Sequence, residues 1–584
     1  MPGKGKSMHV ATIRRQHNGK VYETHLLRHS FREDGKVKNE TLANLSSLPK
    51  ETIELIKGSL SGTSYVGAND SFEIERSLAH GHVAALAAMA ERLGLGSLLG
   101  PACKERDIAL GLVIARCLAP GSKLATSRWW QDTTLAVDLG IGDAGTDEIY
   151  AAMDWLRERQ GAIEARLARR HLSPGSRVLY DLSSSWMQGT KCPLAAFGYS
   201  RDHKRGKPQI EYGLMTDFEG RPISIEVFSG NTADPTAFVS AVAAVRTRFG
   251  LEELTMVGDR GMITSARIEA LGTLGGLDWI TSLRAPAVRS LAQAGSLQLG
   301  LFDETSLATI SHPDYPGERL IACRNPALAQ ERTRKRNELI EATRAALASL
   351  SASVAAKGNL DATTIAGRVE RVINRYKVAK HFVTEISEGR LGFHLDEASV
   401  RQEAALDGIY VIRTSVEESS LSDAQVVEAY KGLAVVERDF RNLKAIDLEL
   451  RPVYHWTEER VRAHVFVCML AAYLNWHLRK ALAPLCFTDE EIPARNDPVS
   501  PARRSSAARV KDAAKLSSEG LELHSYGTLL SHLGSLSRSR ILFAGGHTTE
   551  KLSLPTPIQR RAFELIGVPI PITVRGKSTE TPRR

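Results

Sequence analysis

The hydrophobic positions of the chain change their spacing near residue 176, and this change separates a helical part from a part that mixes strands and helices. Residues 80–172 place apolar side chains at helical spacing and predict a series of helices. Later segments are short apolar or alternating runs, which predict strands. Ahead of both parts, residues 8–47 alternate around Asn18 and Gly19, a pair typical of hairpin turns, and predict a small β unit.

The elements predicted after residue 176 follow the order of an RNase H-like core. Val178–Asp181 is an apolar run and predicts a buried strand. Residues 210–216 and 222–228 alternate on either side of a turn and predict an antiparallel hairpin. A helix, a strand, a second helix and a further strand are predicted at 235–249, 254–257, 263–274 and 278–283. We therefore predict an α/β fold with an RNase H-like mixed sheet flanked by helices.

This core is interrupted before its last elements. Residues 285–405 contain predicted strands, a charged helix near 326–350 and further strands near 365–395. Long connections without structure are uncommon in compact domains, so the segment is predicted to be an inserted subdomain. The core is predicted to resume with a strand and two helices, at 408–413, 422–444 and 458–482.

Six segments follow from these patterns. A chain of 584 residues is too long for one hydrophobic core, so a division of this kind is expected. A small β unit is predicted at 1–65 and a helical region at 66–172. The core is predicted at 173–284 and 406–487, with the inserted subdomain between its two parts at 285–405. A linker with a C-terminal region is predicted at 488–584.

Composition and charge narrow the class of protein. The formal net charge of +9 suits a polyanionic partner, although many basic proteins bind no nucleic acid. The six cysteines are scattered and none forms a C-x2-C pair, which disfavours a zinc ribbon and indicates reduced thiols in a cytosol. The most apolar stretch, Val465–Tyr473, is too short to span a bilayer. We expect a cytoplasmic protein with no membrane partner.

Three acidic residues lie in three different predicted elements. Asp181 and Asp259 each end an apolar strand-like run, and Glu437 lies in a long helical pattern. Two aspartates at strand ends and a helical glutamate can meet at one edge of a sheet, where they suit two divalent cations and phosphodiester chemistry. An aspartate at a strand end is often only a turn or cap residue. Three further aspartates compete and rank lower, namely Asp217, Asp234 and Asp407.

The glutamate helix carries a polar stripe. Tyr430, Glu437 and Lys444 are spaced by seven residues and are predicted to share one face, with Arg441 one turn after Glu437. A solvated Glu–Arg pair is the ordinary alternative. Flanking apolar residues place the stripe at the border of the core, which favours a metal ligand beside phosphate-binding groups.

A family resemblance rests on these blocks. The stretch Tyr430-x2-Leu433-x3-Glu437-x6-Lys444 resembles the Tyr-x2-Arg-x3-Glu-x6-Lys signature of a large branch of bacterial insertion-sequence DDE transposases. Leu433 departs from it, because the signature has Arg there, and Arg438 and Arg441 are the available substitutes. Four further blocks are similar to those of this family, at 180–185, 228–234, 257–262 and 451–456.

The resemblance implies a transposase that binds the terminal inverted repeats of its element, cuts at the ends and joins them to target DNA. It implies that Asp181, Asp259 and Glu437 hold two Mg²⁺ ions, for which Mn²⁺ substitutes. It further implies a homodimer in the synaptic complex and help from the inserted subdomain in holding the transposon end. The short helices with basic faces at 66–172 are interpreted as the end-binding region, and a plain helical domain is the alternative. The residues that the resemblance assigns to DNA are Tyr430, Arg438, Arg441, Lys444 and, by stacking on a flipped base, Trp186.

Alternatives stay open at this stage. A nuclease on the same fold would need no end specificity and no strand joining. A transposase-derived DNA-binding protein would keep the fold without cutting. Trp186 is more commonly a core residue than a stacking platform. Two interpretations are open for His455 and His464, a place beside Glu437 and a structural role, and the structural role is favoured.

Overall fold

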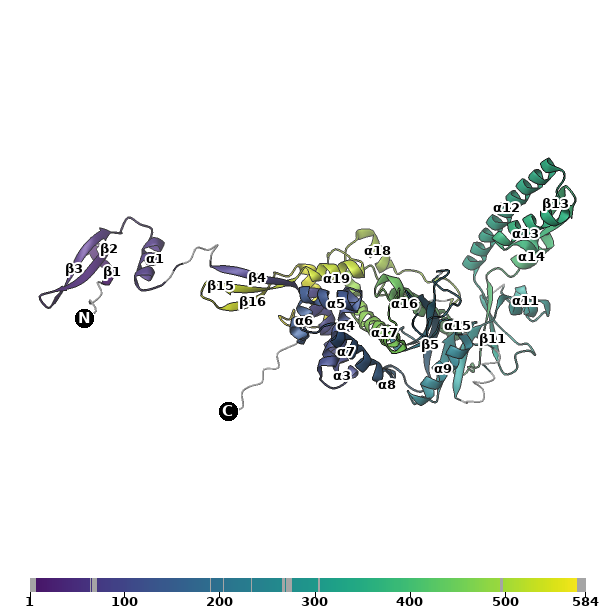
Figure 1. Cartoon of the computed structure of the whole chain (residues 1–584), viewed down its shortest axis with the longest axis horizontal. Coiled ribbons are helices and arrows are strands. Elements are labelled where there is room, and N and C mark those ends of the chain that lie inside the picture. The colour runs from purple at the N-terminus through teal and green to yellow at the C-terminus, as the bar shows by residue number, and fades with distance from the viewer. Residues whose placement is uncertain are drawn as a thin grey trace. The chain divides into compact units, whose positions relative to one another are not determined.

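The computed structural model describes most of the chain in two compact units (Figure 1). The first unit combines Met1–Ser77 with Arg538–Ser553, and the second combines Leu78–Ser537 with Leu554–Arg584. Within these bounds the structure describes residues 7–574 except 64, 66–70, 190, 203, 233, 265–267, 269–275, 303–304 and 494–496. The C-terminal residues 576–584, which look disordered in the sequence, lie outside the described residues.

The first unit begins with the predicted β unit, which is an antiparallel three-stranded sheet. Its two hairpins turn at Asn18–Gly19 and Asp34–Gly35, and all four of these residues have positive φ. Two-residue turns of this kind favour Asn, Asp and Gly because other residues are strained at positive φ. The strands and the helix that follows are β1 (Ser7–His17), β2 (Lys20–Glu33), β3 (Lys36–Asn44) and α1 (Lys50–Leu60).

A second sheet of the first unit joins residues from the two ends of the chain. β4 (Phe72–Ala79) pairs with β15 (Ser537–Phe543), which pairs with β16 (Thr548–Leu552). Arg540 Nε lies 2.9 Å from Glu75 Oε2 across this sheet. The alternating polar residues of β4 gave no indication of so distant a partner.

The second unit begins with the predicted helical run. α4 and α7 pack against each other and against α17 (Glu458–Ala481), whose apolar residues are buried over most of its length. A helix that is apolar on nearly all sides belongs in a core, which explains why α17 lies between the helical region and the sheet. The helices of this region are α2 (Gly81–Arg92), α3 (Leu95–Leu99), α4 (Lys104–Leu118), α5 (Lys123–Trp129), α6 (Thr134–Leu139), α7 (Thr146–Glu158) and α8 (Gln160–His171).

The large mixed sheet confirms the predicted fold class. Its eight strands lie in the order β10-β11-β14-β9-β8-β5-β6-β7, and only the β5–β8 and β8–β9 pairs are parallel. The five strands from β7 to β9 have the order and directions of an RNase H-like core. The strands are β5 (Ser176–Trp186), β6 (Gln209–Asp217), β7 (Pro222–Ser229), β8 (Leu254–Gly258), β9 (Leu277–Ser282), β10 (Leu307–Ile310), β11 (Arg319–Arg324) and β14 (Ile409–Thr414).

Helices cover both faces of this sheet. α9 (Asp234–Thr247) packs on β6, while α16 (Leu433–Arg441) packs on β5 and α17 on β7. Tyr180 in β5 donates a hydrogen bond to the carbonyl oxygen of Ala237 in α9. Successive side chains of a strand point to opposite faces, so Asp181 faces the other layer, which contains α16. The helix predicted at 263–274 lies largely outside the described residues.

The segment 285–405 contributes to the sheet and also builds a separate helical group. β10 and β11 pair beside β14 and extend the sheet at that edge. The separate group has its own core, which includes Leu347, Val354 and Ile365. The segment begins with α11 (Ala285–Gln293). The elements of the separate group are α12 (Pro326–Lys357), α13 (Ala362–Tyr376), β12 (Phe382–Ser387), β13 (Arg390–Leu395) and α14 (Glu397–Ala404).

The prediction of strands from 365 onward is wrong for its first part, because α13 is a helix. Its β-branched residues resemble a strand by composition. Ile365, Val369, Val372 and Ile373 are spaced as the apolar face of a helix, and all four lie in or against the core of the helical group.

Helix α12 is held at its base by a buried ion pair. Both guanidinium Nη atoms of Arg336 donate to the carboxylate of Asp407, at 2.9 and 2.6 Å, and Thr333 adds a third hydrogen bond. By length and composition, α12 is the one unbroken described helix that could cross a membrane, and bent α4 and α5 pass the same test as a pair. Buried residues such as Leu347 show that α12 is instead the central helix of the inserted group.

We predict that Leu347→Ala loosens the inserted helical group without loosening the large sheet. Leu347 is fully buried in a core that the sheet does not share, so a cavity there costs about 2–5 kcal/mol. Hydrogen exchange should quicken in α12 and α13 while β5 and β8 keep their protection. Leu339→Ala, on the more exposed side of α12, is the matched control and should cost about 0.5 kcal/mol or less. Equal loosening of β5 would contradict the separation of the two cores.

Candidate functional site

The pairing of β5 with β8 places two aspartates side by side. The parallel register ends at Tyr180 opposite Gly258, so the next residues, Asp181 and Asp259, follow at the same edge of the sheet. Strand β5 does not end at Asp181, as the sequence suggested, but continues to Trp186 in its pairing with β6. Asp181 therefore lies where the parallel pairing ends rather than where the strand ends.

The third carboxylate, that of Glu437, lies on a helical segment that is interrupted. The helix predicted at 422–444 consists of α15 (Asp423–Lys431), α16 (Leu433–Arg441) and a π-helical turn at Asn442–Ile446. Gly432 separates the first two, and a Cβ there would lie 2.9 Å from the Ala429 carbonyl oxygen and 3.4 Å from Leu179 Cδ2. The junction thus packs closely on the face of β5 that Leu179 shares with Asp181.

One cavity of about 360 Å³ collects these groups. We call it the carboxylate pocket. Asp181, Asp259, Glu437 and Tyr430, four residues singled out in the sequence, all contribute to its lining. The complete lining is Asp181, Asp259, Asn325, Tyr410, Tyr430, Lys431, Leu433, Ala434 and Glu437.

Electrostatics in the carboxylate pocket favour neutralisation of negative charge. Burial, together with the nearby charges of Asp259 and Glu437, raises the pKa of Asp181 to about 7. The Leu182 N–H, which donates to Asp181 Oδ1 at 2.7 Å, acts in the opposite direction. Carboxylates that repel one another in a partly buried pocket are suited to share cations.

The carboxylate oxygens of Asp181, Asp259 and Glu437 suit divalent cations that are each bound by only one or two carboxylates. All three acidic groups offer oxygen, which hard cations such as Mg²⁺ prefer. Within the part of the chain that the structure describes, no three His, Cys, Asp or Glu side chains gather closely enough to hold one ion together. Mg²⁺ is usually bound by one or two carboxylates, with water and substrate phosphate completing its coordination.

Tyr430 is held in place at the pocket. Its hydroxyl lies 2.7 Å from Ser282 Oγ at the end of β9, and burial raises the pKa of the phenol. Its helix begins at Ser422, whose side chain and that of Gln425 form a reciprocal capping box. Tyr430 is therefore a fixed, protonated hydrogen-bonding group beside the acids.

Two neighbours of Tyr430 differ from what the family signature would supply. Leu433, which replaces the signature arginine, is an apolar part of the pocket lining. Lys431 is the cation in the lining, but its Nζ donates to the carbonyl oxygens of Pro498, Val499 and Ser500. Sequence reasoning missed this contact, because the segment around 498 has the composition of a linker.

Lys444 is not part of the lining of the carboxylate pocket. It lies in the π-helical turn, where the i→i+5 bonding changes the spacing of residues around the axis. Its Nζ donates at 3.0 Å to Asp202, whose side chain is 1% exposed. Arg451 pairs with the same carboxylate, and the backbone N–H of Trp186 donates to it at 3.4 Å. Asp202 was missed because it stands within a basic stretch.

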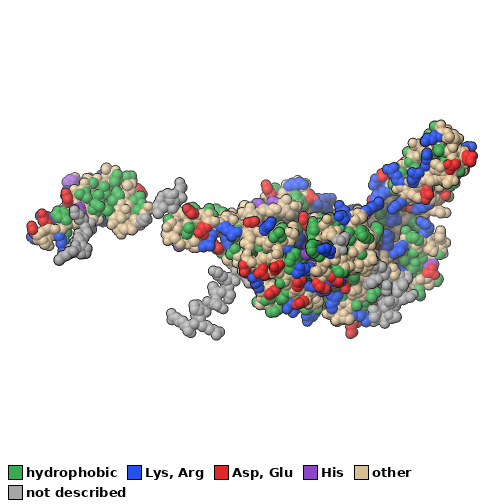
Figure 2. All heavy atoms as spheres, viewed as in Figure 1, with side chains coloured by type: hydrophobic (Ala, Val, Ile, Leu, Met, Phe, Trp, Pro, Cys, Tyr) green, Lys and Arg blue, Asp and Glu red, His purple; other side chains and the backbone are tan. Residues whose placement is uncertain are grey.

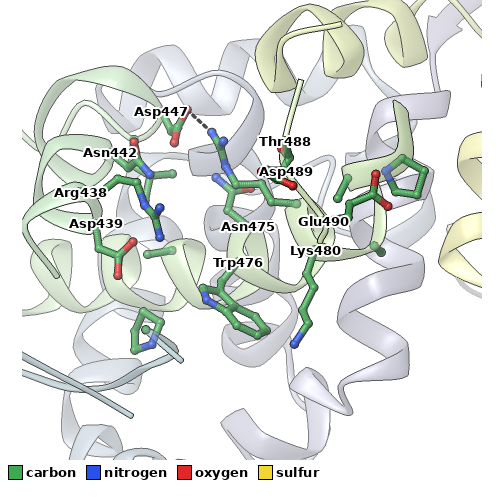
Figure 3. Close-up of a pocket in the computed structure, with 18 residues that line it drawn as sticks. Arg438, Asp439, Asn442, Asp447, Asn475, Trp476, Lys480, Thr488, Asp489 and Glu490 are labelled. Carbon is green, nitrogen blue, oxygen red and sulfur yellow. Dashed lines mark hydrogen bonds and ion pairs between the residues drawn. The ribbon is translucent and has the colours of Figure 1, made fainter. Parts of the chain in front are cut away.

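The two predicted substitute arginines also lie away from the carboxylate pocket. Arg438 lines a different cavity of about 690 Å³, together with Asp439 and Trp476 (Figure 3). Arg441 is exposed on the surface of α16. Helical spacing therefore separates Arg438 from Glu437 although the two are adjacent in sequence.

The remaining candidates have other surroundings. Asp217 accepts hydrogen bonds from the backbone of Glu219 and Arg221 in the β6–β7 turn. Asp407 is the partner of Arg336. Trp186 is half-buried, with Lys204 Nζ 5.9 Å from its ring centre, and it is not part of the pocket lining.

Comparisons with known proteins bear on this geometry. Residues 10–65 match the family model of the IS1634 family transposase N-terminal domain, and residues 174–474 match that of the transposase DDE domain. No curated protein matches the chain. Among solved structures, a piggyBac transposase synaptic complex with hairpin DNA is similar over 74% of this chain and 70% of that chain, at 10% identity and a TM-score of 0.33. A TM-score this low does not by itself establish a shared fold.

We predict that Asp202→Ala destabilises the protein by about 3–5 kcal/mol, because it leaves Lys444 and Arg451 partly buried without their counter-charge. Urea unfolding of the purified chain would measure the loss. Glu397→Ala is the matched control, since the Glu397–Arg401 pair is about three-quarters exposed and should contribute less than about 1 kcal/mol. A loss no greater than that of the control would show that Asp202 does not tie these segments together.

Proposed function

Because the chain belongs to the family of transposases with a DDE domain, whose model matches slightly more than half of it, we propose that Asp181, Asp259 and Glu437 are its catalytic acids. The protein is an insertion-sequence DDE transposase, a DNA-binding enzyme of transposition. The observation that carries the residue assignment is the lining of one pocket by these three carboxylates. Membership of this protein in the Tyr-x2-Arg-x3-Glu-x6-Lys branch of the family stays a prediction.

The cofactor assigned to the pocket is Mg²⁺, as two ions, with Mn²⁺ able to substitute. DDE domains use divalent metal ions, and the oxygen donors of the carboxylate pocket suit hard cations. When bound, such ions activate the attacking oxygen and stabilise the leaving oxygen of a phosphodiester. The chain's own part is to hold Asp181 and Asp259 in adjacent strands and Glu437 on a helix packed against them.

Tyr430 is assigned to the DNA phosphate nearest the cut. Its hydroxyl is fixed by Ser282 and faces the same pocket as the acids. Arg441 is exposed and is assigned to more distant phosphates. Lys444 and Arg438 are assigned to DNA only after a rearrangement, because Lys444 is tied to Asp202 and Arg438 lines another cavity.

The transposon end is assigned to the basic surface where the inserted helices join the core (Figure 2). A cavity of about 490 Å³ there includes Arg260, the neighbour of Asp259. Positive charge so close to the acids suits the phosphate backbone of a substrate. The cationic residues of its lining are Arg260, Arg289, Arg332, Lys335, Arg336, Lys377 and Lys380.

Further assignments extend the proposal beyond the catalytic pocket. End recognition is assigned to the helical region at 66–172, with the β unit beside it in sequence. Two ends must be cut and joined together, so a homodimer in the synaptic complex is proposed. A cytoplasmic location is proposed for the protein, and all six cysteines are unpaired, as suits a reducing compartment.

The test is a cleavage and strand-transfer assay on a labelled duplex that carries the inverted repeat bordering the gene, with Mg²⁺ or Mn²⁺. Asp181→Asn, Asp259→Asn and Glu437→Gln should each lower the rate at least about a thousandfold, which is about 4 kcal/mol of transition-state stabilisation. Gel-shift measurements should show that the duplex is still bound. Glu428→Gln, an exposed acid on α15 outside the pocket, is the matched control and should retain activity.

Three outcomes would overturn parts of the proposal. Activity that survives Glu437→Gln would mean that the third acid has been misassigned. Tight end binding with no cutting in any metal would favour a transposase-derived DNA-binding protein. Cutting without end specificity or strand joining would favour a nuclease on this fold.

A further inference from the structure

A second cationic pocket lies outside the carboxylate pocket. It forms where the helical region, through α4, α5 and α7, meets the segment between the π-helical turn and α17. The cavity is about 440 Å³, which is within the usual range for small-molecule sites. Its lining includes Arg116, Lys123, Tyr150, Arg451, His455 and His464, so it holds the two histidines that the proposed function does not use.

Two cations at this pocket are buried. Lys123 and Arg116 are each only 5% exposed. Lys123 Nζ lies 3.4 Å from His464 Nδ1, and Arg116 donates to the carbonyl oxygens of Gly121 and Leu448. Neither cation forms an ion pair with a carboxylate anywhere in the described ranges of the chain. A buried charge without a counter-charge is costly, so this arrangement is incomplete as a purely structural one.

The electrostatics of the pocket agree with this geometry. Burial, together with the charge of the neighbouring Arg116, lowers the pKa of Lys123 to about 7. Burial and these two cations also lower the pKa values of His455 and His464. The imidazoles are therefore neutral near pH 7 and add no positive charge of their own. Glu449, which is exposed, is the single acidic residue of the lining.

The walls of the pocket leave it open to solvent. The rings of Tyr150, His455 and His464 follow one another at centre distances of 6.1 and 5.1 Å. Tyr454 is 60% exposed and also belongs to the lining. Arg451, at the same rim, also pairs with Asp202. A ligand could thus enter from solvent and reach the buried cations.

We propose that this pocket binds a phosphate group, with Lys123 and Arg116 beneath it and Arg451 at the rim. A guanidinium presents paired N–H groups that match two phosphate oxygens, and an ammonium adds a compact positive charge. A doubly charged oxyanion would supply the counter-charge that the protein does not. The phosphate can belong to a small molecule or to the DNA backbone. This inference does not depend on the acids of the proposed function.

The experiment is thermal unfolding of the full chain in inorganic phosphate, compared with sodium chloride at equal ionic strength, without metal or DNA. Phosphate should raise the unfolding temperature in a saturable way. Lys123→Met, which keeps the length of the side chain, should weaken the apparent phosphate affinity about tenfold or more. Lys551→Met is the matched control, because it removes an exposed lysine of β16 that lines neither cationic cavity, and it should keep the effect.

The results that would overturn the proposal are equally specific. No stabilisation of the wild type by phosphate would refute it, as would stabilisation that Lys123→Met retains in full. If Lys123→Met does not fold, acylation of wild-type lysines followed by mass spectrometry replaces it. Phosphate should then protect Lys123 and leave Lys551 reactive, and equal reactivity of Lys123 with and without phosphate would refute the site.

A separate measurement distinguishes the two sources of phosphate. If the DNA backbone is the source, Lys123→Met should weaken duplex binding and reduce its salt dependence by about one charge. If the source is a small molecule, duplex binding should be unchanged while the response to inorganic phosphate is lost. Either result supports a phosphate site, and neither requires that Asp181, Asp259 or Glu437 be catalytic.

Discussion

The parallel pairing of β5 with β8 is the constraint on which the carboxylate pocket depends. Its register sets Asp181 beside Asp259, and the alternation of the strand turns Asp181 toward the layer of α16. A shift of one residue would send Asp181 to the opposite face, among the side chains that contact α9. Glu437 completes the pocket because α16 packs on β5 at that face.

The cations around the pocket are engaged by other groups of the chain. Lys431 is bound by three backbone carbonyls, and Lys444 and Arg451 share Asp202. These contacts engage the three cations with groups outside the lining of the carboxylate pocket, where burial, together with the charges of Asp259 and Glu437, raises the pKa of Asp181. The fold thus engages several nearby cations with other groups, while the charge of Arg201 still lowers the pKa of Asp181.

The sequence was most informative where one local period decided the structure. The β6–β7 hairpin, helix α9 and strands β8 and β9 follow directly from apolar spacing. Composition misled the prediction at α13, where β-branched residues occupy a helical face. The break at Gly432 and the π-helical turn at Lys444 depend on packing against β5 and Asp202, which a local pattern does not contain. For the same reason the sequence brought together Asp181, Asp259, Glu437 and Tyr430 but did not indicate the ion pair of Lys444 with Asp202.

Several elements late in the sequence pair with elements near its start. β4 finds its sheet partner only in β15, and the carbonyl oxygen of Ile566 accepts a hydrogen bond from Arg92. The carbonyls that bind Lys431 also come from this late segment. During synthesis Asp181, Asp259 and Glu437 therefore leave the ribosome well before residues 498–500, whose carbonyls bind Lys431. Contacts of such long sequence separation form slowly. A chain that stops before residue 498 would carry all three acids inside an incomplete wall, so the pocket is finished only after residues 498–500 have been synthesised.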